Sequence, residues 1–77
     1  MRSSPEHVVD LRTGPAFSSP LVTRMPPNTL LTENTCYVKG ERYGPLCNQV
    51  AGYDGWASVT MLDGRAGYAP DVCIYLR

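Results

Sequence analysis

Short runs of β-branched, aromatic and aliphatic residues alternate with turn-forming residues along the whole chain. Seven Gly and seven Pro are spread over the 77 residues. No window of about 11 residues is free of turn formers and shows the 3.6-residue apolar period of an amphipathic helix. The pattern therefore predicts no long helix. It favours an all-β domain of about five to seven short strands.

The predicted strands each end at a turn signal. They cover residues 7–11, 21–25, 29–38, 46–50, 56–62, 65–69 and 72–76. Turns and loops are expected at residues 12–20, 26–28, 39–45, 51–55 and 63–64. The strongest hairpin signal is Asp63-Gly64, because both residue types tolerate a positive φ. Residues 1–6 are predicted to form a polar N-terminal tail, and residues 7–77 a single domain.

Alternation within residues 56–62 assigns the two faces of one predicted strand. Ala57, Val59 and Met61 are expected to face the core. Trp56 falls on the opposite, outward face, next to a predicted turn. We interpret Trp56 as a contact residue, because large aromatic side chains favour binding surfaces. The alternative is that Trp56 only covers the edge of the barrel.

The charges argue against a nucleic-acid partner, and the lack of a long apolar run argues against membrane insertion. Seven Lys and Arg balance seven Asp and Glu, and the charges are scattered singly. A nucleic-acid-binding domain would show a basic excess or stripe. No apolar run approaches the roughly 20 residues that cross a bilayer, and residues 1–6 lack the apolar stretch of a signal peptide. We expect no nucleic-acid partner and no membrane insertion.

Three Cys are many for a chain of this size. A hairpin centred on Glu41-Arg42 would place Cys36 opposite Cys47, with Cβ atoms about 4.5–5.5 Å apart, close to what a disulfide requires. We therefore predict a Cys36–Cys47 disulfide, with Cys73 as a small core residue. The pairs Cys36–Cys73 and Cys47–Cys73, and no bridge at all, remain alternatives. A disulfide would favour an oxidising compartment.

Nothing in the sequence forms a catalytic or metal-binding constellation. The single His, His7, lies at the edge of the predicted tail, and no spacing brings it to a thiol. Asp54, Asp63 and Asp71 each fit a turn-forming role. The sequence lacks the pair of Cys, separated by two to four residues, that is typical of a zinc site. The Gly spacing is not that of a phosphate loop. We expect no enzymatic activity, no metal and no cofactor.

Motifs near both ends of the chain resemble the bacterial SH3-like (SH3b) domain family. The first half carries Leu11-Arg12-Thr13-Gly14-Pro15, followed by Ser18-Ser19-Pro20-Leu21-Val22 and Pro27-Asn28-Thr29. The second half carries Gly55-Trp56, Val59, Asp63-Gly64-Arg65, Gly67-Tyr68-Ala69 and Val72. This half is also similar to the eukaryotic SH3 pattern. The resemblance spans residues 8–76 and implies a small SH3-like barrel.

The chain also departs from the family pattern. Residues 39–55 are longer than the usual connection, and Cys73 stands where a closing aromatic residue is frequent. Residues 12–20 contain no Asp or Glu, although acidic residues are typical of the corresponding loop in eukaryotic SH3 domains. These departures argue against the recognition of proline-rich peptides.

The resemblance implies a non-catalytic binding module. SH3b domains often accompany cell-wall hydrolases, and some bind peptidoglycan peptides, so the implied partner is a wall peptide or a protein. The implied contact surface comprises Phe17, Tyr53, Trp56 and Tyr68; ordinary barrel packing is the alternative for each Tyr. An extracellular or cell-envelope location is expected, with a cytoplasmic one as the alternative. A second interpretation is a small structural or accessory subunit that docks onto a larger protein assembly.

Overall fold

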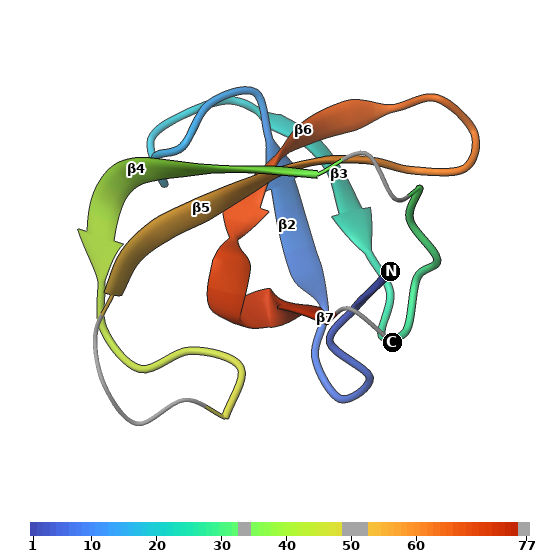
Figure 1. The fold of residues 1–77 in the computed structure, drawn as a ribbon, viewed down its shortest axis with the longest axis horizontal. Helices are drawn as coiled ribbons and strands as arrows, with labels where there is room; N and C mark the ends of the chain where they lie inside the picture. The colour runs from blue at the N-terminus through green and yellow to red at the C-terminus, as the bar shows by residue number, and fades with distance from the viewer. Residues whose placement is uncertain (33–34, 49–52, 76–77) are drawn as a thin grey trace.

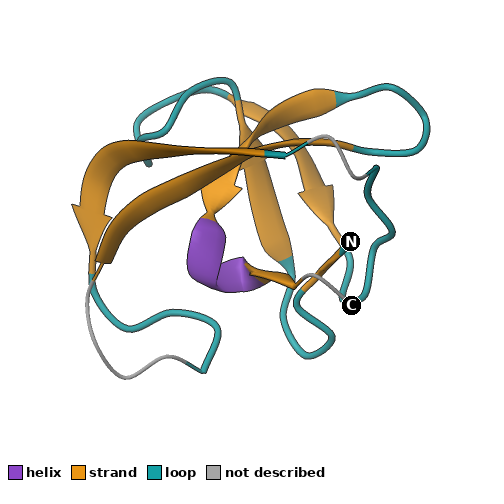
Figure 2. Ribbon diagram, in the orientation of Figure 1, coloured by secondary structure: helices purple, strands orange, loops and turns teal. Residues whose placement is uncertain are grey.

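The computed structural model describes residues 1–32, 35–48 and 53–75, and it confirms the all-β prediction. The elements in chain order are β1 (Arg2–Ser3), β2 (Val9–Arg12), β3 (Leu21–Met25), β4 (Cys36–Tyr43), β5 (Tyr53–Thr60), β6 (Ala66–Pro70), the 3₁₀ turn η1 (Asp71–Cys73) and β7 (Ile74–Tyr75). Figure 2 shows η1 as the one short helical turn among the strands that are drawn. In the described part of the chain, no helix has the length and apolar character needed to span a bilayer.

The described strands form two antiparallel sheets. The larger sheet has the order β3-β2-β6-β5-β4, and β1 pairs with β7 in the smaller one. In Figure 1 the larger sheet curves, so that β2 and β3 cross the long β4 and β5. Isolated bridges join Arg2 to Leu30 and Leu31 to Met61. The described strands therefore enclose a common interior without forming a single closed sheet.

The core lies on the concave face of the larger sheet. Ala57 and Val59 are fully buried there, and Met61 is buried at the end of the same run, so the face assignment from alternation is confirmed. The remaining buried members of the cluster come from β2, β3, β6, η1 and the bridge segment; they are Val9, Leu11, Met25, Leu31, Ala69 and Cys73. Because the apolar residues of β5 recur with period two, they reach the same interior as those of β2 and β6.

The predicted hairpin at Asp63-Gly64 is confirmed. Strands β5 and β6 pair from Trp56–Pro70 through Thr60–Ala66. Gly64 has a φ of 97°, a left-handed value that side chains with a Cβ rarely adopt. The Met61 amide donates to the Arg65 carbonyl at 2.7 Å and closes the turn.

The predicted polar tail is instead partly built into the fold. Ser3 and Ser4 are fully buried, and their backbone amides donate to the carbonyls of Thr29 and Cys73, each at 2.9 Å. The Ser3 hydroxyl also donates to the Pro26 carbonyl and accepts a hydrogen bond from the Thr29 amide. Small hydroxyl side chains are tolerated in this interior because their polar groups find partners. The polarity of residues 1–6 was therefore misleading.

The turn predicted at residues 39–45 is wrong, because β4 continues through them to Tyr43. The chain bends instead, and the β4–β5 register shifts between Lys39 and Tyr43. A Cβ on Gly40 would lie within 2.6 Å of Pro15 and Trp56, so Gly40 allows the bend to pack closely on both. The strand predicted at residues 46–50 is absent over Leu46–Asn48. Its last two residues, and residues 51–52 of the next predicted turn, lie outside the described residues.

Candidate functional site: a pocket beside the disulfide

A pocket of about 250 Å³ lies between β2, the loop of residues 13–20, the segment of residues 44–48 and η1. Its lining residues are His7, Val8, Val9, Asp10, Arg12, Phe17, Leu46, Cys47, Pro70 and Cys73. These positions come from four separate stretches of the chain. The lining is mainly apolar, with a few polar groups from β2 and the residues just before it, which is the usual composition of a ligand site.

The polar lining on β2 is held by ion pairs. Arg12 lies 3.3 Å from the Asp10 carboxylate, and Arg24 lies 3.4 Å from the other oxygen of the same carboxylate. The Arg12 guanidinium also donates to the Ser19 carbonyl at 3.0 Å. It lies over the Phe17 ring, 5.9 Å from the ring centroid. Arg12 therefore joins β2 to the loop of residues 13–20 and fixes the position of Phe17 at the pocket.

Phe17, which lines the pocket, packs in an aromatic cluster with Tyr43 and Trp56, which do not line it. The Phe17 ring centroid lies 5.1 Å from that of Trp56 and 6.3 Å from that of Tyr43, and all contacts are edge-to-face. Edge-to-face packing stabilises such rings beyond the area that they bury. The Phe17 amide donates to the Glu41 carboxylate at 2.7 Å, which ties the loop to the bend of β4.

The outward exposure predicted for Trp56 is wrong, because its side chain is fully buried. Trp56 does leave β5 on the face opposite Ala57 and Val59, as alternation predicts. That face is covered here by Phe17 and by the bend of β4, and the indole Nε1–H donates to the Glu41 carbonyl at 2.8 Å. Trp56 is therefore a buried packing residue that contacts Phe17, a residue of the pocket lining.

The four predicted contact residues do not share one surface. Phe17 is 38% exposed and lines the pocket. Tyr53 is 44% exposed and lies at the start of β5, paired with Tyr43. Tyr68 is half-buried on the outer face of the larger sheet, between Ser58 and Arg12 in the strand register. Only Phe17 and Trp56 are brought together, and a binding role for Tyr53 and Tyr68 stays a prediction.

The disulfide joins Cys47 to Cys73 and not to Cys36, so the predicted pairing is wrong. The Sγ atoms are 2.06 Å apart and the Cα atoms 5.3 Å apart. The expected hairpin does not form, and Cys36 instead pairs in register with Ser58 on β5. Cys36 is an exposed thiol. Cys73 is a core residue as expected, but it is covalently linked because η1 brings it to the segment of residues 44–48.

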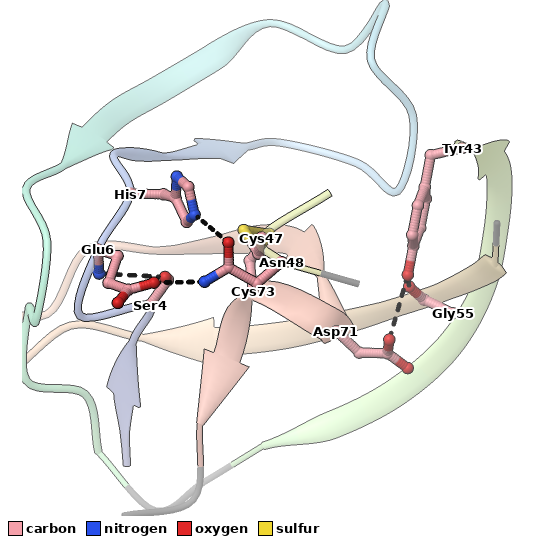
Figure 3. The surroundings of a disulfide bond; sticks show 9 residues. All are labelled: Ser4, Glu6, His7, Tyr43, Cys47, Asn48, Gly55, Asp71 and Cys73. Atoms are coloured by element: carbon pink, nitrogen blue, oxygen red, sulfur yellow. Dashed lines mark hydrogen bonds between the residues drawn. A yellow bond between two sulfur atoms is a disulfide. The ribbon is translucent and has the colours of Figure 1, made fainter. Parts of the chain in front are cut away.

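Side-chain hydrogen bonds of Asn48 also hold the segment of residues 44–48, next to the disulfide. His7 Nε2 lies 3.2 Å from Asn48 Oδ1, and Asn48 Nδ2 donates to the Glu6 carboxylate. Figure 3 shows these three side chains on one side of the disulfide and the Tyr43–Asp71 contact on the other. Cys47 and Asn48 have φ values of 48° and 71°. Two successive left-handed residues reverse the chain at the pocket wall.

Several lining residues carry no signal of a binding role in the sequence, including His7, Val8, Asp10 and Leu46. They lie in segments that pattern analysis assigned to a tail edge or to ordinary strands. Pro70, by contrast, directly follows Gly67-Tyr68-Ala69, one of the motifs noted in the sequence. No group of three or more His, Cys, Asp or Glu side chains is arranged to hold a metal ion in the described ranges.

Tyr43 forms a buried polar contact at the end of β4. Its hydroxyl oxygen lies 2.7 Å from the Gly55 carbonyl oxygen and 3.1 Å from Asp71 Oδ1, and the single hydroxyl hydrogen is shared between these two acceptors. Burial of the phenol, reinforced by the negative charge of Asp71, raises the pKa of Tyr43 to about 12. The neutral phenol is therefore the form that the folded protein favours, and it links β4 to η1.

This contact makes stability depend on alkaline pH. The folded-state pKa lies above the unfolded value of about 10, so the stabilisation is complete below pH ~10 and is lost as pH rises towards ~12. We expect the free energy of unfolding, measured by urea denaturation, to fall by on the order of 2 kcal/mol across this window. Tyr43→Phe should remove most of the fall, whereas Tyr37→Phe, at an exposed phenol on β4, should retain it. Identical pH profiles for the two variants would contradict the assignment.

Searches with the sequence and the structure identified no matching protein-family model, no matching curated protein and no matching solved structure.

Proposed function

We propose that the protein is a non-catalytic binding module whose pocket receives side chains of an extended peptide. The observation that carries the proposal is the pocket itself, with the exposed or partly exposed apolar side chains of Val8, Phe17 and Leu46 around it. Its volume of about 250 Å³ is below the roughly 300–1,000 Å³ typical of sites that enclose a small molecule. Such a volume suits one or two side chains of a longer ligand.

The construction of the pocket supports this proposal. Arg12 and Glu41 hold the loop that carries Phe17, and the disulfide holds the opposite wall. A preformed site loses less conformational entropy when it binds, which favours affinity for a flexible peptide. Wall peptides and segments of proteins both bind in this way, as extended and flexible chains.

The resemblance to SH3b domains gives the proposal its class of partner. One stretch that carries the resemblance, residues 11–15, contributes Arg12 to the lining, and the lining residue Pro70 directly follows another, residues 67–69. By this resemblance we propose an SH3-like module of the extracellular space or cell envelope. The Cys47–Cys73 disulfide supports such an oxidising location.

The test compares two matched variants in co-sedimentation with purified, insoluble peptidoglycan. Val8 lines the pocket and is 59% exposed, whereas Leu62 lies in the β5–β6 turn, is 66% exposed and does not line the pocket. Both positions accept Asp with little cost to folding because they are exposed. We expect Val8→Asp to weaken binding at least about tenfold and Leu62→Asp to leave it unchanged.

Three other outcomes would contradict peptide binding at the pocket or favour the alternative function. Equal binding by the two variants would exclude the pocket as the contact site. If the wild-type chain does not sediment with the wall, the same pair is tested against a library of extended peptides, and failure there would overturn peptide binding altogether. Self-association in a sedimentation series over concentration would instead favour the assembly-subunit alternative.

A further inference from the structure

The disulfide is part of the wall of the pocket. Both Cys47 and Cys73 belong to the lining, together with Leu46, which directly precedes Cys47. Cys73 is anchored in the core through η1, with only 3% of its surface exposed. Cys47 belongs to the segment of residues 44–48, which follows β4 and forms no strand. The covalent bond therefore fastens a wall segment without strand hydrogen bonds to a rigid part of the molecule.

The backbone conformation of residues 44–48 requires the constraint that the disulfide provides. Cys47 has a φ of 48°, in the left-handed region where a non-glycine residue other than Asn or Asp is disfavoured. Such a conformation persists where the surrounding structure imposes it. The described contacts on this segment are the disulfide, the packing of Leu46 and Cys47 against the core, and the side-chain hydrogen bonds of Asn48 to His7 and Glu6. The hydrogen bonds are exposed and the packing of Leu46 and Cys47 is only partly buried, so the disulfide is the one covalent constraint on this segment.

We propose that the pocket is under redox control: reduction of the Cys47–Cys73 disulfide releases residues 44–48 and weakens peptide binding. This inference rests on the proposed function, because it concerns regulation of the same pocket. The pocket residues on β2 and the Phe17 loop are held by other contacts, through Arg12 and Glu41. Reduction therefore removes one wall and leaves the other in place.

The chemistry is a two-electron thiol–disulfide exchange with a dithiol reductant. Cys47 is partly exposed and Cys73 is buried, so the attacking thiolate reaches the Cys47 Sγ. A bond forms between the reductant and Cys47, the Sγ–Sγ bond breaks, and Cys73 leaves as a thiolate that takes a proton from solvent. The second thiol of the reductant then displaces Cys47. The protein gains two thiols, and the dithiol becomes a cyclic disulfide.

The experiment uses the full chain with Cys36→Ser, which leaves the disulfide as the only redox-active pair. Cys36 is exposed on β4 and does not line the pocket. Backbone order parameters are measured by ¹⁵N NMR relaxation in the oxidised protein and after reduction with dithiothreitol, alongside co-sedimentation with purified peptidoglycan. We expect the order parameters of Leu46, Cys47 and Asn48 to fall below about 0.6 on reduction, while those of β5 and β6 stay near about 0.85. Binding should weaken at least tenfold and recover on reoxidation.

The two readouts separate this proposal from the proposed function. If the oxidised chain does not bind peptidoglycan, that arm of the function fails, and the order parameters still decide whether reduction frees the wall. Unchanged order parameters at residues 46–48 would overturn redox control whatever the binding result. Loss of β-structure in circular dichroism on reduction would also overturn it, because the disulfide would then be a structural staple of the whole domain. His7→Ala, which removes the contact with Asn48, is the control, and it should lower the order parameters of residues 46–48 less than reduction does.

Discussion

Trp56→Ala is expected to destabilise the domain by about 3–5 kcal/mol, more than Val59→Ala does. Trp56 is fully buried, and its removal leaves Phe17 and Tyr43 without the ring on which both pack. It also leaves the Glu41 carbonyl without its indole donor. Domains of this size have little stability in reserve, so a large part of the variant should be unfolded at room temperature. Thermal and urea denaturation followed by circular dichroism measure the difference.

The control variant is Trp56→Phe, which keeps an aromatic ring and removes the Nε1–H donor. We expect it to fall between the wild type and Trp56→Ala, because it retains most of the packing. Val59→Ala opens only a small cavity in the main core and should cost about 1–3 kcal/mol. A Trp56→Ala variant that melts above Val59→Ala would mean that the indole is a surface group, as the alternation pattern alone had suggested.

Removal of the Cys47–Cys73 disulfide is expected to cost about 3 kcal/mol of stability. The bond joins residues 26 positions apart, and closing a loop of that length restricts the unfolded chain by about this amount. The double variant Cys47→Ser, Cys73→Ser should therefore unfold at a markedly lower urea concentration. We expect its β-sheet signal at room temperature to resemble that of the wild type, because none of residues 44–48 belongs to a described strand.

Cys36→Ser provides the matched control, since it replaces an exposed thiol without a disulfide partner. Its stability should stay within about 0.5 kcal/mol of the wild type. Peptide mapping without reductant should recover Cys47 linked to Cys73 and Cys36 as a free thiol. Recovery of a Cys36–Cys47 peptide would restore the hairpin pairing and contradict the strand register of β4.

Local features of the sequence were enough to predict the all-β class and one hairpin. Turn formers interrupt the chain at intervals too short for helices, and Asp63-Gly64 supplies the backbone freedom that the β5–β6 turn uses. Alternation also placed Ala57 and Val59 in the core. Each of these features depends on residues that are neighbours in the chain, so a single sequence carries the information.

The candidate site depends on contacts between distant segments. Phe17 was singled out from the sequence and does line the pocket. Leu46, His7 and Asp10 were not, because nothing in their local patterns shows that β2 and residues 44–48 lie side by side. Tyr53 and Tyr68 lie at different places on the sheet, which the aromatic composition alone could not reveal.

The sequence by itself determined the strand periodicity, the hairpin turn and the side of β5 from which Trp56 leaves. Tertiary structure alone decided that Phe17 and the bend of β4 cover that side, and that Cys47 meets Cys73. It also brought Ser3 and Ser4 into the interior. Side-chain direction is set by the local backbone period, whereas burial and cysteine pairing are set by whichever distant segment packs on that side. Only the folded chain specifies that segment.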